Sequence, residues 1–228
     1  MDGQTILVVG ANGALGLEIT NQLMSAGALV IGTARSAESS LRLRADLSQR
    51  LLLDLENQDS IDTLTNYLNN SVEVIDGIVI AAGLVAFGSI HETPNSIQSR
   101  LMQVNALGPI NLVRQLLPKL QRSADSGKHP FVVSISGVIA ENPMAGLAAY
   151  SSSKTAMHGF AIAAAKELKK LGIRWLDARP GHTDSGLAGR AIFGTAPNFG
   201  SGMQVEHVVS RIIQAIKADE KDLPSNSF

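Results

Sequence analysis

The stretch Thr5-Ile6-Leu7-Val8-Val9-Gly10-Ala11-Asn12-Gly13-Ala14-Leu15-Gly16 decides the fold of this chain. Its first five residues are apolar or β-branched and predict a buried strand, and the pattern after the glycines predicts a helix that reaches about Ser25. A strand, a glycine-rich turn and a helix in this order are typical of the first unit of a parallel α/β sheet.

The three glycines of this stretch have separate predicted roles. Gly10 would form the tight turn, Gly13 would let the backbone approach a pyrophosphate, and Gly16 would let the helix pack closely on the strand. The free N–H groups at the start of the helix would point at the phosphates, with Asn12 and Leu15 beside them. A glycine turn without a ligand is the alternative, but the position between strand and helix favours a dinucleotide.

Short apolar runs and longer helical patterns continue to alternate along the chain. Further strands are predicted at residues 29–33, 51–54, 75–81, 131–135 and 174–179, and further helices at residues 59–69, 95–122, 149–171 and 205–218. Asp59 and Ser60 are expected to cap the first of these helices, and Pro109 is the expected boundary or kink of the longest. The pattern predicts an α/β fold, a doubly wound parallel sheet with helices on both faces.

This fold is expected to form one domain over residues 1–228. Residues 182–203 are rich in glycine and small side chains and show weak periodicity, so we expect a mobile substrate loop there. Hydrophobic residues make up 45% of the chain, the net charge is −1 and cysteine is absent. These values argue against nucleic-acid binding, a disulfide framework, a zinc site and a membrane span, and predict a cytoplasmic protein.

The end of the second predicted strand indicates which dinucleotide would bind. It reads Gly32-Thr33-Ala34-Arg35-Ser36, where an NAD-binding chain would carry an acidic residue for the ribose hydroxyls. Arg35 is placed to receive a 2′-phosphate, with hydroxyls from Thr33 and Ser36, so NADP(H) is favoured over NAD. An exposed loop arginine is the alternative. Asp54, with Leu55 beside it, would accept a hydrogen bond from the adenine amino group or serve as a simple turn residue.

Tyr150 and Lys154 open the alanine-rich helix four residues apart, which places the phenol and the ammonium on one helical face. A nearby cation favours the phenolate, so the pair suits proton transfer to or from a substrate oxygen. Upstream, Ser136 ends the fifth predicted strand within reach of such an oxygen. Asn105 would hold water or a backbone group near the lysine.

Together these residues resemble the short-chain dehydrogenase/reductase family, and the resemblance covers nearly the whole chain. It is carried by Gly10, Gly13, Gly16, Asp54, Ala81, Ala82, Gly83, Asn105, Ser136, Tyr150, Lys154, Pro180 and Gly181. It implies a Rossmann-like domain with catalytic Asn105, Ser136, Tyr150 and Lys154. It further implies that Lys154 contacts the nicotinamide ribose and that Pro180 and Gly181 border the nicotinamide pocket. Thr183 would bind the nicotinamide carboxamide or cap the loop.

The chain departs from the family pattern in four places. Ala14 stands where the usual pattern has a glycine, and the usual Asn-Asn-Ala-Gly after the fourth strand is Ala81-Ala82-Gly83 here, without the asparagine side chains. The family serine aligns with Gly137, so Ser136 would have to reach in from a shifted loop, with Ser134 as the other candidate. No strand is predicted after the helix at 205–218, where the family usually has a closing strand.

Two functions follow from the resemblance and its departures. The favoured one is an NADP(H)-dependent oxidoreductase that transfers a hydride between nicotinamide and a small carbonyl or alcohol substrate, with Tyr150 as general acid or base. The alternative is a dinucleotide sensor that keeps the fold without catalysis, for which Gly137 and Ala81-Ala82 are the supporting features. A homodimer is expected, because helices like the one with Tyr150 often form dimer interfaces in this family.

Overall fold

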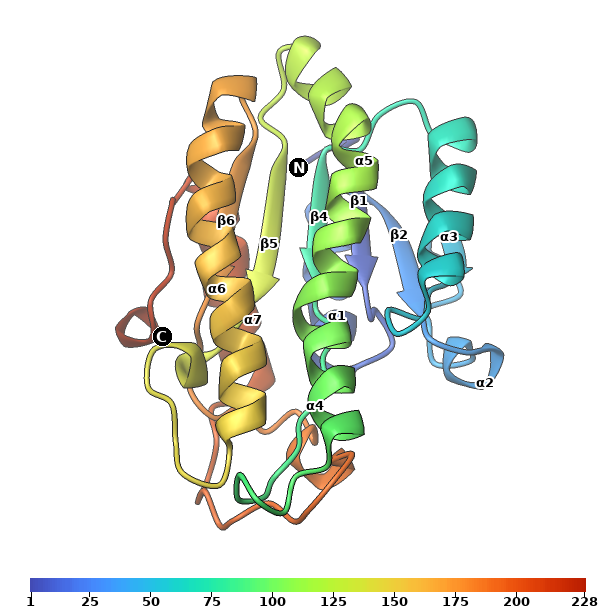
Figure 1. Ribbon diagram of the computed structural model, residues 1–228. Coiled ribbons are helices and arrows are strands. Elements are labelled where there is room, and N and C mark those ends of the chain that lie inside the picture. The colour runs from blue at the N-terminus through green and yellow to red at the C-terminus, as the bar shows by residue number, and fades with distance from the viewer.

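A sheet of six parallel strands forms the centre of the molecule, in the order β3-β2-β1-β4-β5-β6 (Figure 1). The computed structural model describes all 228 residues. The strands are β1 (Thr5–Val9), β2 (Leu29–Ala34), β3 (Gln49–Leu52), β4 (Gly77–Ile80), β5 (Phe131–Ile135) and β6 (Arg174–Ala178). The strand order reverses between β1 and β4, which confirms the predicted doubly wound, Rossmann-like α/β fold and marks the place where such sheets bind ligands.

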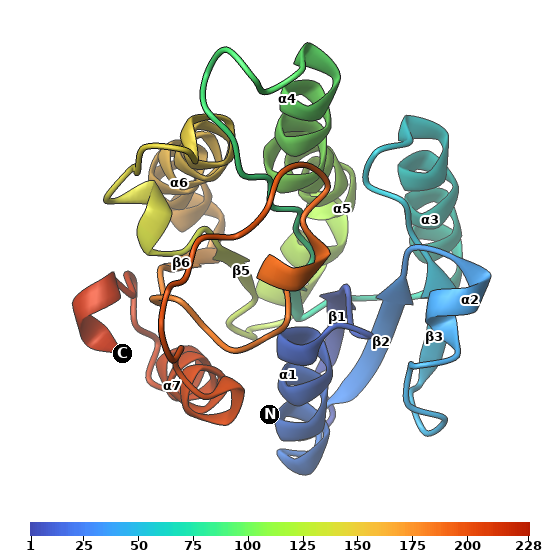
Figure 2. The same ribbon diagram turned by 90° about the horizontal axis from the view of Figure 1, so that it is seen from below.

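Helices cover both faces of the sheet, as the view in Figure 2 shows. They are α1 (Ala14–Ser25), α2 (Ala37–Ser40), α3 (Gln58–Ser71), α4 (Asn95–Met102), α5 (Gly108–Asp125), α6 (Ala148–Leu168) and α7 (Val205–Lys217). Helices α1 and α7 lie together on one face, and α3, α5 and α6 lie on the other. A membrane crossing would need a longer or more apolar helix than any of these.

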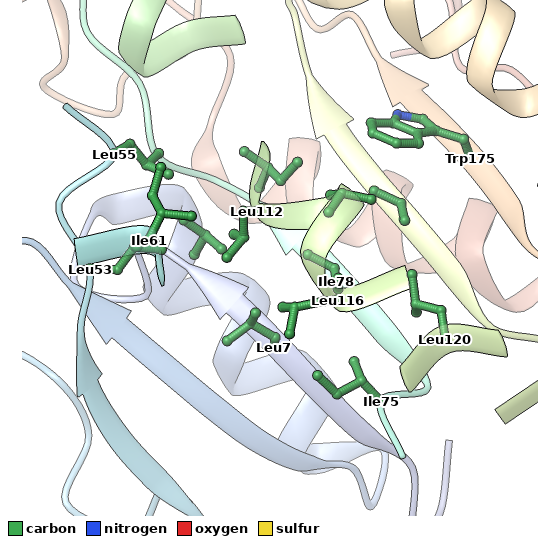
Figure 3. Packing of buried hydrophobic residues seen from close by; sticks show 14 of the residues in the cluster. Leu7, Leu53, Leu55, Ile61, Ile75, Ile78, Leu112, Leu116, Leu120 and Trp175 are labelled. Carbon is green, nitrogen blue, oxygen red and sulfur yellow. The ribbon is translucent and has the colours of Figure 1, made fainter. Parts of the chain in front are cut away.

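Successive residues of β1 enter two different hydrophobic clusters, as the period of a strand requires. Leu7 and Val9 pack with residues of α3, α5 and α6, a cluster that includes Leu112, Leu116 and Trp175 (Figure 3). Ile6 and Val8 pack on the opposite face with residues of α1 and α7. Burial of each such side chain contributes about 1.5–3 kcal/mol, so the two clusters fix the sheet between its helical layers.

Several predicted boundaries differ from the structure, and for β3 and α3 the cause is hydrogen bonds that sequence patterns do not show. Strand β3 begins and ends two residues earlier than predicted, since its pairing with β2 runs from Gln49 to Leu52. Helix α3 is capped by Asn57, whose side-chain oxygen accepts from the Asp59 N–H at 2.9 Å. The predicted cap at Asp59 and Ser60 is therefore wrong, and Ser60 Oγ instead accepts from the Asp54 N–H.

The long helical segment is interrupted where its proline predicts. Residues Gln103–Leu107 form a π-helical turn between α4 and α5, and Pro109 lies in the first turn of α5. Proline has no N–H to donate to the preceding turn, so the regular hydrogen-bond ladder breaks there. The wider turn carries Asn105 into the interior, toward the candidate site.

Residues 182–203 form an irregular segment, as predicted, but backbone hydrogen bonds fix both its ends and its middle. Thr183 pairs with Met203, and the Ile192 N–H donates to the Val85 carbonyl at 2.9 Å. Beyond α7, Leu223 forms a parallel bridge to Ala178, at the edge of β6. This isolated pair is not a strand, so the prediction that no strand follows α7 is confirmed.

Candidate functional site

A cavity of about 520 Å³ lies at the carboxyl ends of the strands. Loops that follow all six strands reach this end of the sheet, which faces the viewer in Figure 2. The volume lies in the range of small-molecule and cofactor sites. One half of the cavity is formed by the glycine loop and the ends of β2 and β3, and the other half by Tyr150, Lys154 and apolar side chains.

The glycine loop is built as the sequence predicts. Gly10 has φ +79°, a left-handed conformation that favours glycine, and a Cβ on Gly16 would lie 2.1 Å from the Gly10 carbonyl oxygen. Asn12, Gly13 and Leu15 line the cavity, whereas Gly16 packs the helix on the strand outside it. The start of α1 has no side-chain cap and no acidic residue, so its N–H groups suit a pyrophosphate.

The end of β2 arranges its polar residues differently from the prediction. Thr33 Oγ1 is buried and accepts from the Gly10 N–H at 3.2 Å, which braces the glycine loop. Ser36 caps the short helix α2 by accepting from the Ser39 N–H and does not line the cavity, so its predicted contact with the cofactor stays a prediction. Arg35 lines the cavity as predicted.

A second arginine at this end was missed by sequence reasoning. Arg42 follows the short helix α2, which turns the chain back so that Arg42 lines the cavity together with Arg35. Both guanidinium groups are exposed, and neither forms a hydrogen bond or an ion pair within the protein. A pair of unengaged cations at the ribose end of the cavity is suited to a phosphate.

Two carboxylates and Leu55 line the same end, next to the arginines. Asp54 accepts from the Glu56 N–H at 3.0 Å, so it serves as the turn residue that the alternative described, while it still borders the cavity. Arg100 binds both carboxylate oxygens of Glu56 at 2.9 Å and holds the pKa of Glu56 below its usual range. Because Arg100 neutralises Glu56, the charge of Arg35 and Arg42 remains available to a ligand.

The loop after β4 is held by Asn105. Its side-chain oxygen accepts from the Leu84 N–H at 2.8 Å, and its amide donates to the Leu84 carbonyl and to Ser153 Oγ, both at 2.9 Å. Ala81, Ala82 and Gly83 line the cavity just before this point. A Cβ on Gly83 would lie 3.2 Å from Asn105 Oδ1 and 3.5 Å from Lys154 Nζ. Asn105 thus holds a backbone group near the lysine, one of the two predicted roles.

Tyr150 and Lys154 meet at the centre of the cavity wall, one turn apart on α6. Lys154 Nζ lies 6.0 Å from the centre of the Tyr150 ring and donates to the Ile135 carbonyl at 2.8 Å. Burial raises the pKa of Tyr150 to about 12 and lowers the pKa of Lys154 to about 8, the latter against the attraction of Asp177. The Tyr150 hydroxyl forms no hydrogen bond within the protein, which leaves it available to a ligand.

The structure corrects the predicted role of Ser136. Its side chain is fully buried, and its hydroxyl donates to Asp177 Oδ2 at 2.5 Å rather than to a group in the cavity. Ser134 donates to the other oxygen of Asp177 at 2.6 Å. Neighbouring Gly137 has φ +76°, and it carries no hydroxyl. Ser136 borders the cavity, but in this structure the hydroxyls of both serines are engaged by Asp177.

The remaining wall of the cavity is apolar. Val85, Phe87, Ile139 and Leu147 form a separate buried cluster, against which Tyr150, Leu187 and Phe199 pack. Pro180, Gly181 and Thr183 border the cavity as predicted, and Thr183 Oγ1 donates to the Gly181 carbonyl at 3.0 Å.

Three loops build this apolar wall and are joined by backbone hydrogen bonds. The Phe87 N–H donates to the Phe193 carbonyl at 2.9 Å, and the Gly88 N–H donates to the Gly146 carbonyl at 2.8 Å. A Cβ on Gly194 would lie 1.9 Å from the Phe87 carbonyl oxygen, so the chains cross in close contact. The loop after β4 is thereby fixed both to the segment at 182–203 and to the loop before α6.

Comparison with known proteins gives one family. Residues 4–192 match the model of the short chain dehydrogenase family. The uncharacterized oxidoreductase YmfI of Bacillus subtilis is 31% identical over 192 residues, which are 81% of this chain and 76% of that protein.

Solved structures agree with this match. A short-chain dehydrogenase from Streptomyces avermitilis has a TM-score of 0.85 and 26% identity, covering 98% of this chain and 88% of the other. The RhlG/NADP active-site complex of Pseudomonas aeruginosa has a TM-score of 0.85 and 26% identity, covering 98% and 95%.

Proposed function

The chain belongs to the short-chain dehydrogenase family of oxidoreductases, and on that premise we propose that it is an NADP(H)-dependent reductase of small carbonyl compounds or dehydrogenase of the matching alcohols. One observation carries the proposal. Tyr150 and Lys154 lie where the glycine-loop half of the cavity meets its apolar half, so one bound molecule on each side would meet at the phenol.

The residues of the site have definite tasks in this proposal. The glycine loop and the start of α1 would hold the pyrophosphate of NADP(H), which supplies or accepts the hydride when bound. Tyr150 would give its proton to the substrate oxygen in reduction and remove it in oxidation. The Lys154 ammonium favours the phenolate and so opposes the rise that burial gives the pKa of Tyr150.

The preference for NADP(H) rests on charge at the ribose end of the cavity. Arg35 and Arg42 are free of internal partners there, and Arg100 already neutralises Glu56. A doubly charged 2′-phosphate gains from both guanidinium groups, whereas the hydroxyl of NAD gains little. The relative from Pseudomonas aeruginosa, which was solved with NADP, supports the same cofactor.

The apolar wall indicates the kind of substrate. Phe87, Leu147 and Leu187 would contact the carbon skeleton of the substrate beside the phenol. A ketone or aldehyde with an apolar body therefore fits this half of the cavity better than a sugar, whose hydroxyls would be left without partners there.

The direct test is to incubate the protein with NADPH and each of a panel of apolar aldehydes and ketones. The loss of NADPH absorbance measures the consumption of NADPH. Tyr150→Phe keeps the ring and removes only the hydroxyl, so we expect turnover to collapse while the Kd of NADPH stays within a few-fold of the wild type. Wild-type turnover in Tyr150→Phe with any accepted substrate would contradict the proposed proton transfer.

A dinucleotide sensor is the second candidate, and Gly137 is the observation that favours it. A site with a polarising serine would lower the barrier further, and here neither Gly137 nor the buried Ser136 offers a hydroxyl. Tight NADPH binding with no consumption over the whole panel would favour the sensor.

We also propose a homodimer formed through α6. Its support is the exposure of two large apolar side chains on that helix, Phe160 and Ile162. Sedimentation of the wild type and of an Ile162→Lys variant tests it, because a buried lysine would shift the equilibrium toward monomer.

A further inference from the structure

Asp177, in the second-last position of β6, carries a buried carboxylate outside the candidate catalytic pair of Tyr150 and Lys154. Its two oxygens accept from Ser134 Oγ at 2.6 Å and from Ser136 Oγ at 2.5 Å, and His158 Nδ1 lies 2.8 Å from Oδ2. Arg179 Nη1 lies 3.5 Å from the same oxygen. A carboxylate removed from water needs such partners, and this one has four of them from three elements.

The placement of these partners ties Asp177 to Lys154. Lys154 and His158 lie one turn apart on the same face of α6, about 6 Å along the helix axis. His158 contacts Asp177 directly, so the carboxylate lies against the same face of α6 that carries Lys154. The Ile135 carbonyl that accepts from Lys154 stands between Ser134 and Ser136, both of which donate to Asp177. One strand end therefore holds both charges.

This cluster is not arranged as a nucleophilic triad. In a triad the serine hydroxyl donates to the imidazole, and the carboxylate binds the other side of the ring. Here both serine hydroxyls donate to the carboxylate itself, and His158 contacts that same carboxylate. The cluster therefore holds a carboxylate in place through two hydroxyl donors and an imidazole, with Arg179 nearby.

We propose that Asp177 is a positioning residue for the proposed reaction: its buried carboxylate keeps the Lys154 ammonium charged and in place beside Tyr150. This inference rests on the proposed function for its catalytic meaning, while the coupling between the two charges is a property of the free protein. Burial alone favours the neutral amine of Lys154, and Asp177 is the charged group that opposes it.

The other charged groups around Asp177 do not cancel the attraction between its carboxylate and the Lys154 ammonium. Arg179 is also bound by Glu141 and by Asp222, the latter at 2.8 Å, so its positive charge is shared among three acids. From α6 the groups that face Asp177 are His158 and Lys154, and from β5 only the two serine hydroxyls. Because Glu141 and Asp222 offset Arg179, the negative charge of Asp177 remains effective at Lys154.

The test is a pH titration of the Lys154 side chain in the free protein. The NMR chemical shift of its 13C-labelled ε-carbon is measured at each pH. Lys154→Arg, which removes that signal, assigns it. Asp177→Asn keeps the size of the side chain and removes the charge, and we expect the titration midpoint of Lys154 to fall by about one pH unit or more. The alkaline limb of the pH profile of turnover should move in the same direction.

Asp222→Asn is the matched control, because Asp222 binds the same Arg179 through a different nitrogen and its side chain is exposed. It frees part of the Arg179 charge but leaves Asp177 in place, so its Lys154 midpoint should fall clearly less than that of Asp177→Asn. An unmoved midpoint in Asp177→Asn, or an equal shift in both variants, overturns the inference. If Asp177→Asn does not fold, Asp177→Ala must show the same downward shift.

The titration separates this inference from the proposed function. A downward shift in a protein that reduces no carbonyl compound supports the coupling and contradicts the reductase. If the protein reduces carbonyl compounds but its Lys154 midpoint is the same in Asp177→Asn as in the wild type, the reductase function is supported and the coupling is contradicted.

Discussion

Ser136 borders the cavity that contains Tyr150, yet its hydroxyl donates to Asp177 at 2.5 Å. The residue at the end of β5 is therefore part of a buried polar network that joins β5, β6 and α6. In the proposed reaction, proton transfer then depends on Tyr150 and Lys154 without help from this hydroxyl.

Ser136→Ala should for this reason cost stability more than turnover. Removing a donor from a buried carboxylate typically costs about 1–3 kcal/mol, and we expect a loss of that size in urea unfolding. Turnover should fall less than about tenfold, whereas a well-placed donor to the substrate oxygen would cost about 10²–10³. Ser134→Ala, which loses the equivalent bond to Asp177, is the control and should behave alike. A loss of 10²-fold or more in Ser136→Ala alone would restore the predicted contact with substrate.

Arg35→Ala and Arg42→Ala should each weaken NADPH binding selectively. Loss of one charge-assisted contact to phosphate typically costs about 1.5–3 kcal/mol, so we expect the Kd of NADPH to rise about tenfold or more while that of NADH changes little. Titration calorimetry measures both. Arg50→Ala, an exposed arginine on β3 outside the cavity, is the control. Equal losses for the two cofactors would contradict the assignment.

Lys154→Met should stabilise the protein at neutral pH. The pKa of Lys154 is lowered to about 8 by burial, from 10.5 in the unfolded chain. Between pH 8 and pH 10.5 the unfolded chain binds the lysine proton more strongly than the folded protein, so the free energy of unfolding rises with pH. Below about pH 8 Lys154 is charged in both states, and the folded protein is destabilised by the full free energy of burying that charge.

We therefore expect Lys154→Met to raise the free energy of unfolding by about 1–3 kcal/mol at pH 7, and the gain to shrink by pH 10. Urea unfolding at both pH values checks this. Lys166→Met, which removes an exposed lysine from the same helix, should change little at either pH. A destabilised Lys154→Met at pH 7 would mean that the bond to the Ile135 carbonyl outweighs the burial of charge.

A serine cannot simply be introduced at position 137. A Cβ there has space, with the Pro180 carbonyl oxygen as its nearest neighbour at 3.6 Å, but the backbone at φ +76° and ψ 165° is essentially restricted to glycine. Gly137→Ser and Gly137→Ala should both lose about 1–3 kcal/mol of stability in thermal or urea unfolding. An unchanged Tm in either variant would show that the loop adopts an ordinary conformation when a side chain is present.

Sequence patterns predicted the parts of this protein that depend on neighbouring residues. The turn at Gly10, the packing of Gly16 and the pairing of Tyr150 with Lys154 all follow from short spacings within one strand–turn–helix unit or one helix. The sheet followed from the alternation of elements for the same reason.

The predictions that depended on contacts across the fold were less successful. Alternation in β5 places Ser134 and Ser136 on one side but does not tell which partner lies there, and that partner, Asp177, comes from β6. Arg42 was missed because a four-residue helix turns the chain back toward the cavity, and so short an element leaves no periodic pattern.

The backbone hydrogen bonds that join the three loops of the apolar wall limit how substrate preference can be changed by exchanging loops. Each loop is a backbone hydrogen-bond partner of another, and the crossing of Gly194 over the Phe87 carbonyl has no room for a larger residue. Exchange of one loop alone with that of a homologue would leave unmatched backbone groups on the loops that are bonded to it. A chimera that redirects substrate preference should therefore transplant residues 84–93, 140–147 and 182–203 together.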